Sequence, residues 1–141
     1  MASPPLRTVP ILQERNRGFW TSGADGVLRM QRCQHCRHWS YPPNAACPKC
    51  RRRDLGWEAT TGRATLYSYT LNYKAWNPDV PVPYIVAMVE LPEQVGLRMT
   101  TNIVNCATGD LVIDMPLRVT FEQQGEIFIP LFEPDAIGQL P

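Results

Sequence analysis

The sequence has no long apolar run, almost no excess of charge of either sign, and only two histidines. No stretch approaches the roughly 20 apolar residues that cross a bilayer, and the first segment, MASPPLRTVPILQERNRG, lacks the apolar core of a secretory signal. We therefore expect a cytoplasmic protein that binds no membrane. The formal net charge of +1 does not by itself argue for nucleic acid as a partner.

Sequence patterns typical of catalytic sites are also missing. The chain has no Gly-rich phosphate loop, no Gly-x-Ser-x-Gly and no His-Glu-x-x-His. Both histidines, His35 and His38, lie among the clustered cysteines, so the isolated Cys106 has no histidine outside that cluster to activate it. We expect Cys106 to be a small, part-buried thiol, and we predict no catalytic residue in this chain.

The residues that are present predict a mainly β fold. The 14 prolines disfavour long helices, and a hydrophobic fraction of 44% is sufficient for a packed core. Residues 11–26 are predicted as one short helix that Gly23 and Gly26 end, and residues 27–33 as a strand. Five further short strands are predicted at 64–73, 84–91, 96–104, 117–123 and 126–132.

Five short strands at this spacing favour a small barrel, with the five-stranded OB-fold as the leading candidate. A fragment of a β-sandwich is the alternative. In the turn ATGD we expect Gly109 to take a positive φ, and Gly125 is expected to separate the last two strands.

Four of the five cysteines lie within CQHCRHWSYPPNAACPKC, residues 33–50, as two Cys-x-x-Cys pairs. In a reducing compartment, clustered cysteines indicate metal or redox chemistry rather than disulfides. Each pair can place two sulfurs on one side of a metal, so the two pairs together predict a tetrahedral site. We predict a structural zinc ion held by Cys33, Cys36, Cys47 and Cys50, with iron in a rubredoxin-like site as the alternative.

Two other interpretations of this cluster have less support from the sequence. A thioredoxin-type redox pair normally accompanies a βαβ pattern, which is absent here. His35 or His38 could replace one cysteine, but four thiols already complete a ligand set, so both histidines are expected near the surface. A closed site of four thiolates has no open position for water or substrate, and its role is therefore structural.

A basic run brackets the last cysteine of the cluster: Lys49, Arg51, Arg52 and Arg53. A metal-bound loop would hold these side chains close together, and arginine suits phosphate. The hypothesis is that the run binds the phosphates of coenzyme A or of a nucleic acid, and the alternative is a solvated surface. Trp39, Tyr41 and Trp57 are expected to cover the metal site, while other aromatics could stack bases in an OB-fold groove.

The order of these motifs resembles one known family. LRMQRCQHCRHWSYPPNAACPKC is followed by GRATLYSYT, PYIVAMVEL, GLRMTTNIVNC and DMPLRVTFE. Residues 15–133 resemble acyl-CoA-associated proteins that carry a rubredoxin-like zinc ribbon followed by an OB-fold, long catalogued as a domain of unknown function. The predicted organisation is an arm and helix over 1–27, a zinc ribbon over 28–58, an OB-fold over 59–133 and a tail over 134–141.

The resemblance implies a non-catalytic partner of a thiolase-like enzyme or a lipid-transfer-protein-type aldolase. Such complexes make or cleave carbon–carbon bonds in acyl-CoA thioesters during the degradation of aromatic, steroid or fatty acyl-CoA. Zinc would be the cofactor and the CoA thioester a shared ligand. A single-stranded nucleic-acid-binding module is the alternative function, against which the near-neutral charge argues.

One departure from the family pattern concerns two backbone positions. A glycine often follows the second cysteine of each loop in the family, because that residue tends towards positive φ. Here Arg37 and Arg51 stand at these positions. We expect a cost of about 1–2 kcal/mol for each left-handed arginine, which metal binding can offset.

Overall fold

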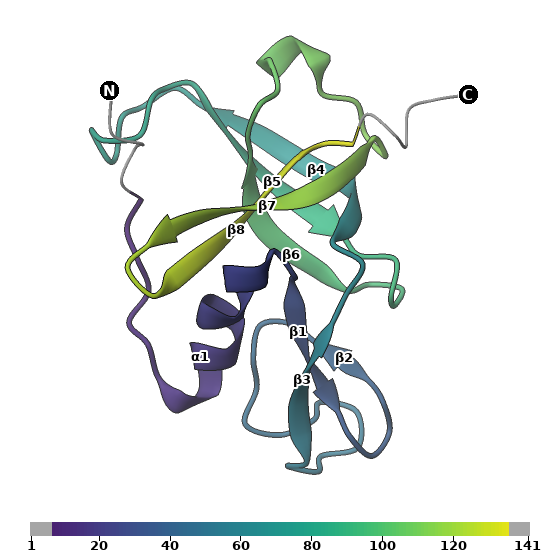
Figure 1. The fold of residues 1–141 in the computed structure, drawn as a ribbon. Helices are drawn as coiled ribbons and strands as arrows, with labels where there is room; N and C mark the ends of the chain where they lie inside the picture. Colours follow the sequence, from purple (N-terminus) through teal and green to yellow (C-terminus); the bar gives the residue numbers. More distant parts are fainter. Residues whose placement is uncertain (1–6, 136–141) are drawn as a thin grey trace.

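A computed structural model describes residues 7–135, which form a helix, a small sheet and a barrel (Figure 1). Residues 1–6 of the predicted arm and 136–141 of the predicted tail lie outside the described residues. No helix within 7–135 is long and apolar enough to span a membrane. In chain order the elements are α1 (Glu14–Thr21), a 3₁₀ helix η1 (Ser22–Asp25), β1 (Arg29–Cys33), β2 (Trp39–Ser40), β3 (Leu55–Ala59), β4 (Arg63–Asn72), β5 (Tyr84–Glu90), β6 (Arg98–Ile103), a 3₁₀ helix η2 (Thr108–Asp110), β7 (Pro116–Gln124) and β8 (Ile127–Pro134).

The five strands after Gly62 form a closed barrel in the order β4-β5-β6-β8-β7, and β7 pairs with β4 to close it. All pairs are antiparallel except β6 with β8, which meet in parallel at Ile103 and Phe132. This is the strand order of an OB-fold, so the predicted mainly β fold is confirmed. The sandwich alternative is wrong because the sheet closes on itself.

The barrel core comes from alternate residues of each strand. Strand β5 is apolar almost throughout, yet only Ile85, Ala87 and Val89 are buried, because successive side chains point to opposite faces. Leu66 of β4 and Phe132 of β8 are fully buried in the same cluster. The apolar run therefore supplies both a core face and an outer surface.

The N-terminal helix is shorter than predicted. Residues 14–21 are α-helical, and the chain then tightens into η1, which ends at Gly26 with a φ of 79°. Phe19 is buried in the core cluster and packs against the rings of Trp20 and Tyr41. The helix thus contacts both β8 of the barrel and β1 of the small sheet, and Figure 1 shows it beside that sheet and below the barrel.

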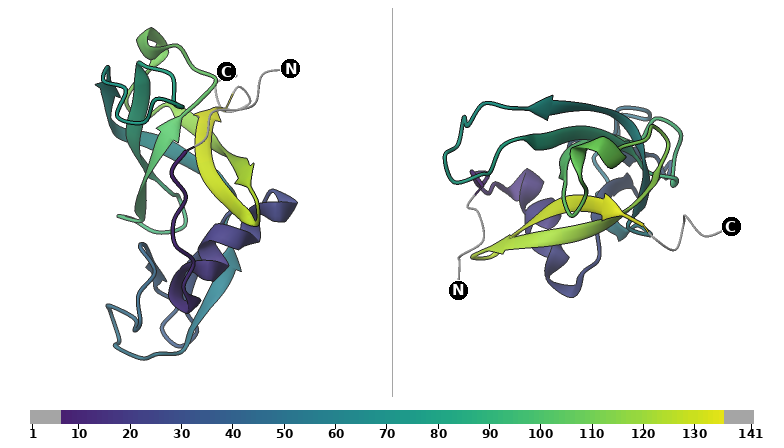
Figure 2. Two further views of the ribbon diagram at one scale, coloured as in Figure 1. Left: turned by 90° about the vertical axis from the view of Figure 1, so that its left-hand side faces the viewer. Right: turned by 90° about the horizontal axis from the view of Figure 1, so that it is seen from above.

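The small sheet has the order β2-β1-β3 and forms one end of an elongated molecule, with the barrel at the other end (Figure 2). Trp39 of β2 is buried in the same core cluster as the barrel residues. The side-chain amide of Gln94, in the turn between β5 and β6, accepts from the N–H of Trp39 and donates to its carbonyl, at 3.0 Å each. Packing and paired hydrogen bonds together fix the two parts against each other.

Of the two glycine predictions for the turns, the one for Gly125 is confirmed and the one for Gly109 is wrong. Gly125 lies between β7 and β8 with a φ of 63°, as expected for a residue that separates two strands. Gly109 does not take a positive φ, because it sits inside η2. In that long connection the left-handed residues are Asn105, with a φ of 54°, and Asp114, with a φ of 70°. Short polar side chains tolerate this conformation better than most residues do.

Candidate metal centre

Two loops of the small sheet bring Cys33, Cys36, Cys47 and Cys50 together. One sulfur from each lies within 4.8 Å of the other three. Two short sulfur–sulfur contacts join the loops, at 3.5 Å between Cys33 and Cys50 and 3.6 Å between Cys36 and Cys47. The structure therefore gathers four sulfur donors at one point.

Backbone N–H groups point at the first sulfur of each loop. The N–H groups of His35 and Cys36 donate to the sulfur of Cys33 at 3.4 Å. In the second loop, Lys49 and Cys50 donate in the same way to the sulfur of Cys47, again at 3.4 Å. Such donors favour a thiolate over a neutral thiol.

The residue after each pair has a left-handed backbone, as expected from its position. Arg37 has a φ of 68° and Arg51 a φ of 66°. Each donates its N–H back to the carbonyl of the loop's first cysteine, at 3.0 Å to Cys33 and 2.8 Å to Cys47. Two non-glycine residues are thus held in a strained conformation by the loops that position the sulfurs.

The pKa values of Cys33 and Cys50 are shifted in opposite directions. The N–H of Cys36 is the main reason that the pKa of Cys33 is lowered to about 6. The N–H of Arg52 favours the thiolate of Cys50, but burial and the other three sulfurs outweigh it and raise the pKa of Cys50 to about 11. Four thiolates at one point need a cation to offset their mutual repulsion.

This donor set fits a zinc ion. Four thiolates at a Zn–S distance of about 2.3 Å would lie about 3.8 Å apart in a tetrahedron, close to the spacings found between the loops. Neither histidine contributes a donor atom to the group, in agreement with their expected place outside the ligand set. With four sulfur donors the site would be complete, and it would hold the two loops together without an open position for chemistry.

Cys106 lies in the connection after β6, away from this centre. Its sulfur donates to the carbonyl of Ala107 at 3.3 Å. Burial, with a smaller contribution from the charge of Asp110, raises the pKa of the Cys106 thiol. The thiol is therefore protonated and weakly nucleophilic at neutral pH, which agrees with the expected small, part-buried residue.

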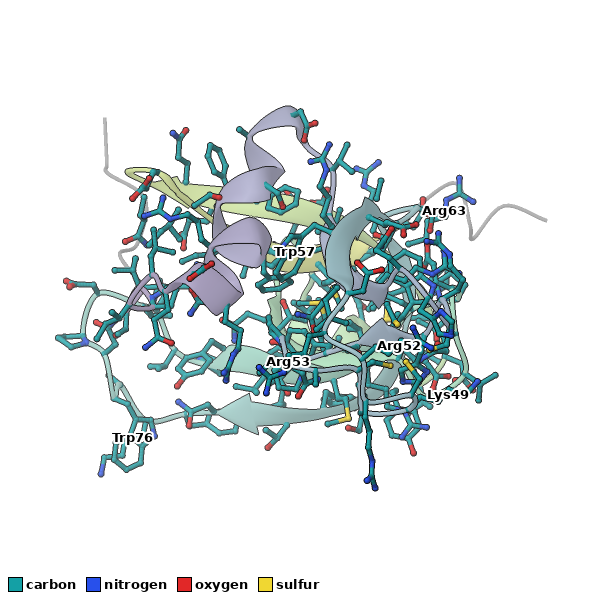
Figure 3. All side chains as sticks on the ribbon, turned by 90° about the horizontal axis from the view of Figure 1, so that it is seen from below. Lys49, Arg52, Arg53, Trp57, Arg63 and Trp76 are labelled. Carbon is teal, nitrogen blue, oxygen red and sulfur yellow. The ribbon has the colours of Figure 1, made fainter. Side chains whose placement is uncertain are left out.

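The basic run surrounds the second loop, but its members do not gather at one spot. The N–H of Cys47 donates to the carbonyl of Arg52 at 2.8 Å, so the backbone of the run is part of the loop that positions the sulfurs. The side chains of Arg51, Arg52 and Arg53 are exposed. Figure 3 shows Arg53 on the side of α1 and Lys49 towards the opposite side.

Most arginines outside the basic run form ion pairs with carboxylates, whereas within the described part of the chain the run itself does not. Eight arginines have a carboxylate oxygen within 4.0 Å: Arg7, Arg17, Arg29, Arg32, Arg37, Arg63, Arg98 and Arg118. Within residues 7–135, the four members of the basic run form no ion pair, and neither does Arg15 of α1. The unneutralised cations of the described chain thus lie mainly at the ribbon end.

The aromatic residues near the cysteines, which were expected to cover the metal site, pack against the core and the helix. Trp39 is buried in the core shared with the barrel, where the guanidinium of Arg32 lies 4.4 Å from the centre of its ring. Tyr41 packs on Phe19. Trp57 lies against α1 at Gly18, which the sequence could not indicate because the two are distant along the chain.

Comparison with known families agrees with this architecture. Residues 20–56 match the rubredoxin-like zinc ribbon domain of ChsH2, and residues 57–122 match the C-terminal OB-fold domain of ChsH2. A chain of the solved structure described as Ltp2-ChsH2(DUF35) aldolase is 33% identical to this one, with a TM-score of 0.78. The alignment covers 89% of this chain and 98% of that one.

Two curated relatives match this chain over part of their own length. A Thermomonospora curvata protein, named as an enoyl-CoA hydratase alpha subunit, is 34% identical over 131 residues, which are 92% of this chain and 40% of the relative. A Methanocaldococcus jannaschii DUF35 domain-containing scaffold protein is 33% identical over 94 residues, 65% of each chain. The matched segments therefore cover less than two thirds of the length of either relative.

Proposed function

This chain belongs to the DUF35 family, with the zinc ribbon and OB-fold of ChsH2, and from that premise we propose that it is a non-catalytic subunit of an acyl-CoA-processing complex. Its partner is a thiolase-like or lipid-transfer-protein-type aldolase enzyme that makes or cleaves carbon–carbon bonds in acyl-CoA thioesters. The chain contributes to assembly of the complex and to CoA binding.

The observation that carries the proposal is the likeness to the Ltp2-ChsH2(DUF35) aldolase chain over almost the whole of that chain, at 33% identity. The description of that structure joins two components in one aldolase. The name of the Thermomonospora curvata relative, an enoyl-CoA hydratase alpha subunit, likewise describes part of an enzyme acting on a CoA thioester. Both point to a subunit that works beside another chain.

The chemistry of the described residues supports a non-catalytic role. We assign Cys33, Cys36, Cys47 and Cys50 as ligands of a structural zinc ion, which would supply folding stability rather than a reactive centre. The raised pKa of Cys106 argues against a nucleophile outside that site. The chemistry of the complex is therefore assigned to the partner.

The basic run is assigned to CoA. Lys49, Arg51, Arg52 and Arg53 have no carboxylate partner within the described residues, and zinc would fix the loop that carries them. CoA carries phosphates at its nucleotide end, and planar guanidinium groups bind phosphate oxygens in pairs. A rigid loop would present these groups with little further loss of conformational entropy.

The test is purification of the tagged chain at native abundance from its own cells, with identification of what accompanies it. A thiolase-like, aldolase or related acyl-CoA enzyme in a fixed ratio to this chain is the expected result. Recovery of the chain alone, or with nucleic acid as its main companion, would overturn the proposal.

A further inference from the structure

A polar hollow of about 710 Å³ lies between the start of α1 and the zinc ribbon, which we call the Trp57 groove. Its volume is within the range of small-molecule sites. It is separate from the metal centre, since none of the four cysteines lines it. The lining residues are Gln13, Glu14, Arg15, Gln31, Asn44, Ala45, Arg53, Leu55 and Trp57.

The aromatic wall of this groove depends on Gly18. A Cβ atom at Gly18 would lie 2.2 Å from Nε1 of Trp57, so only glycine lets α1 approach the indole this closely. Trp57 is half-buried and packs against the hydrophobic core, which holds its ring in place. The groove therefore has a fixed aromatic surface, contributed by β3 (Figure 3).

Apart from Trp57, Ala45 and Leu55, the lining residues of the groove are polar, and hydrogen bonds hold one wall in place. Gln31 is buried, and its side-chain amide donates to the carbonyl of Asn44 at 2.9 Å and accepts from the N–H of Asn44 at 2.8 Å. These two hydrogen bonds fix the loop that forms one wall. The opposite wall is the first turn of α1.

Two arginines without carboxylate partners line this groove, one from each part of the molecule. Arg15 comes from α1 and Arg53 from the end of the basic run, and neither forms an ion pair within residues 7–135. Glu14 is the one carboxylate among the lining residues, so the groove keeps a net positive charge. Guanidinium groups on both walls beside an indole suit a ligand that combines phosphate with an aromatic ring.

We propose that the Trp57 groove binds the phosphorylated purine end of a nucleotide, with the base on Trp57 and the phosphates on Arg15 and Arg53. The identity of this ligand rests on the proposed function: if that function holds, the ligand is CoA, bound by its phosphorylated adenosine end. Within the basic run, Arg53 lines the groove, whereas Lys49, Arg51 and Arg52 do not. The proposal for the groove therefore assigns nucleotide phosphates to Arg53 and not to the other three residues.

The experiment titrates the zinc-loaded chain with adenosine 3′,5′-bisphosphate while following the indole N–H resonance of Trp57. We expect saturable binding that shifts this resonance. Arg15→Ala and Arg53→Ala should each weaken binding about five- to tenfold, as expected when a partly exposed charge-assisted hydrogen bond is lost. Arg17→Ala is the matched control, because Arg17 lies on the same helix but is paired with Glu126 and does not line the groove.

Three probes define the outcomes. Equal affinity of wild type, Arg15→Ala and Arg53→Ala for the bisphosphate, or an unmoved Trp57 resonance, overturns the proposal. If inorganic phosphate binds as tightly as the bisphosphate, the groove does not recognise a purine, and that part of the proposal is wrong. If a single-stranded oligonucleotide binds more tightly than the bisphosphate, the groove recognises nucleic acid instead.

A chain that purifies with an acyl-CoA enzyme but binds no bisphosphate refutes only the proposal for the groove. A chain that binds bisphosphate in the groove but has no such partner refutes the proposed function alone.

Discussion

The barrel and the zinc ribbon are stabilised in different ways. The barrel surrounds a continuous core with residues such as Leu66, Leu117 and Phe132 fully buried. In the ribbon the buried apolar side chains, such as Met30 and Trp39, face that same core, and the two cysteine loops bury chiefly Cys33 and Cys47. The far end of the ribbon thus has no apolar core of its own, and a metal ion takes its place.

This difference bears on function. A loop held by metal needs few apolar side chains, so its surface can carry several cations without carboxylate partners. On the barrel, by contrast, Arg98 pairs with Glu90 and Arg118 pairs with Glu133. We infer that the ribbon end is the ligand-binding end, and the predictions below separate the two regions.

The largest expected effect is loss of the metal. Cys47→Ser should abolish stoichiometric zinc binding and unfold the loops over residues 33–52, since zinc contributes on the order of 10 kcal/mol in small zinc modules. Zinc content and amide NMR spectra check this. Cys106→Ser is the matched control and should keep one zinc per chain. Dispersed ribbon resonances in metal-free Cys47→Ser would contradict the prediction.

The next effect concerns the barrel. Phe132→Ala removes a fully buried ring and should lower the free energy of unfolding by about 3–5 kcal/mol. The folded fraction should still bind zinc, because the metal ligands lie in the other region. Val95→Ala, at a side chain that is 97% exposed, should change stability by less than about 0.5 kcal/mol. Zinc loss in folded Phe132→Ala would show that the two regions are not separable.

A smaller effect is expected for the basic run in the assembled complex. Arg51→Ala, Arg52→Ala and Arg53→Ala together should raise the Michaelis constant for acyl-CoA several-fold and leave zinc content unchanged, because exposed contacts to phosphate are individually weak. Arg17→Ala with Arg118→Ala removes two paired cations and serves as the control. If complex formation and the Michaelis constant both stay at wild-type values, the run is only a solvated surface.

The smallest effect compares the two cysteine loops. Arg51→Gly relieves a left-handed arginine and should stabilise the zinc-bound protein by about 1 kcal/mol. Arg37→Gly should gain less, because it also breaks the 2.7 Å ion pair of Arg37 with Glu58. Thermal unfolding of both variants gives the comparison. Destabilisation by Arg51→Gly would mean that its backbone is not strained.

The sequence predicts local features of this molecule well. Paired cysteines specify their own geometry within a few residues, so their convergence and the left-handed backbone of Arg37 and Arg51 follow from spacing and family pattern. The five barrel strands appear close to their predicted limits, because alternation and turn residues mark both ends.

Features that depend on tertiary contact could not be predicted. The helix is shorter than the apolar and glycine pattern suggests, since η1 tightens where Gly23 packs against Phe121 and Phe128. Nothing local places Trp57 against Gly18, or Arg15 across a groove from Arg53. The one local hint of this contact is Gly18 itself, because a glycine inside a predicted helix can mark a place where another residue packs closely.

The most direct test of the account is reconstitution of this chain with its copurified partner. Acyl-CoA turnover is measured for the chain alone, for the partner alone and for both together. We predict no turnover by the chain alone, and a lower Michaelis constant or a higher rate for the complex than for the partner alone. Turnover by the isolated chain that Cys106→Ala abolishes would contradict the central claim that this subunit binds and assembles but does not catalyse.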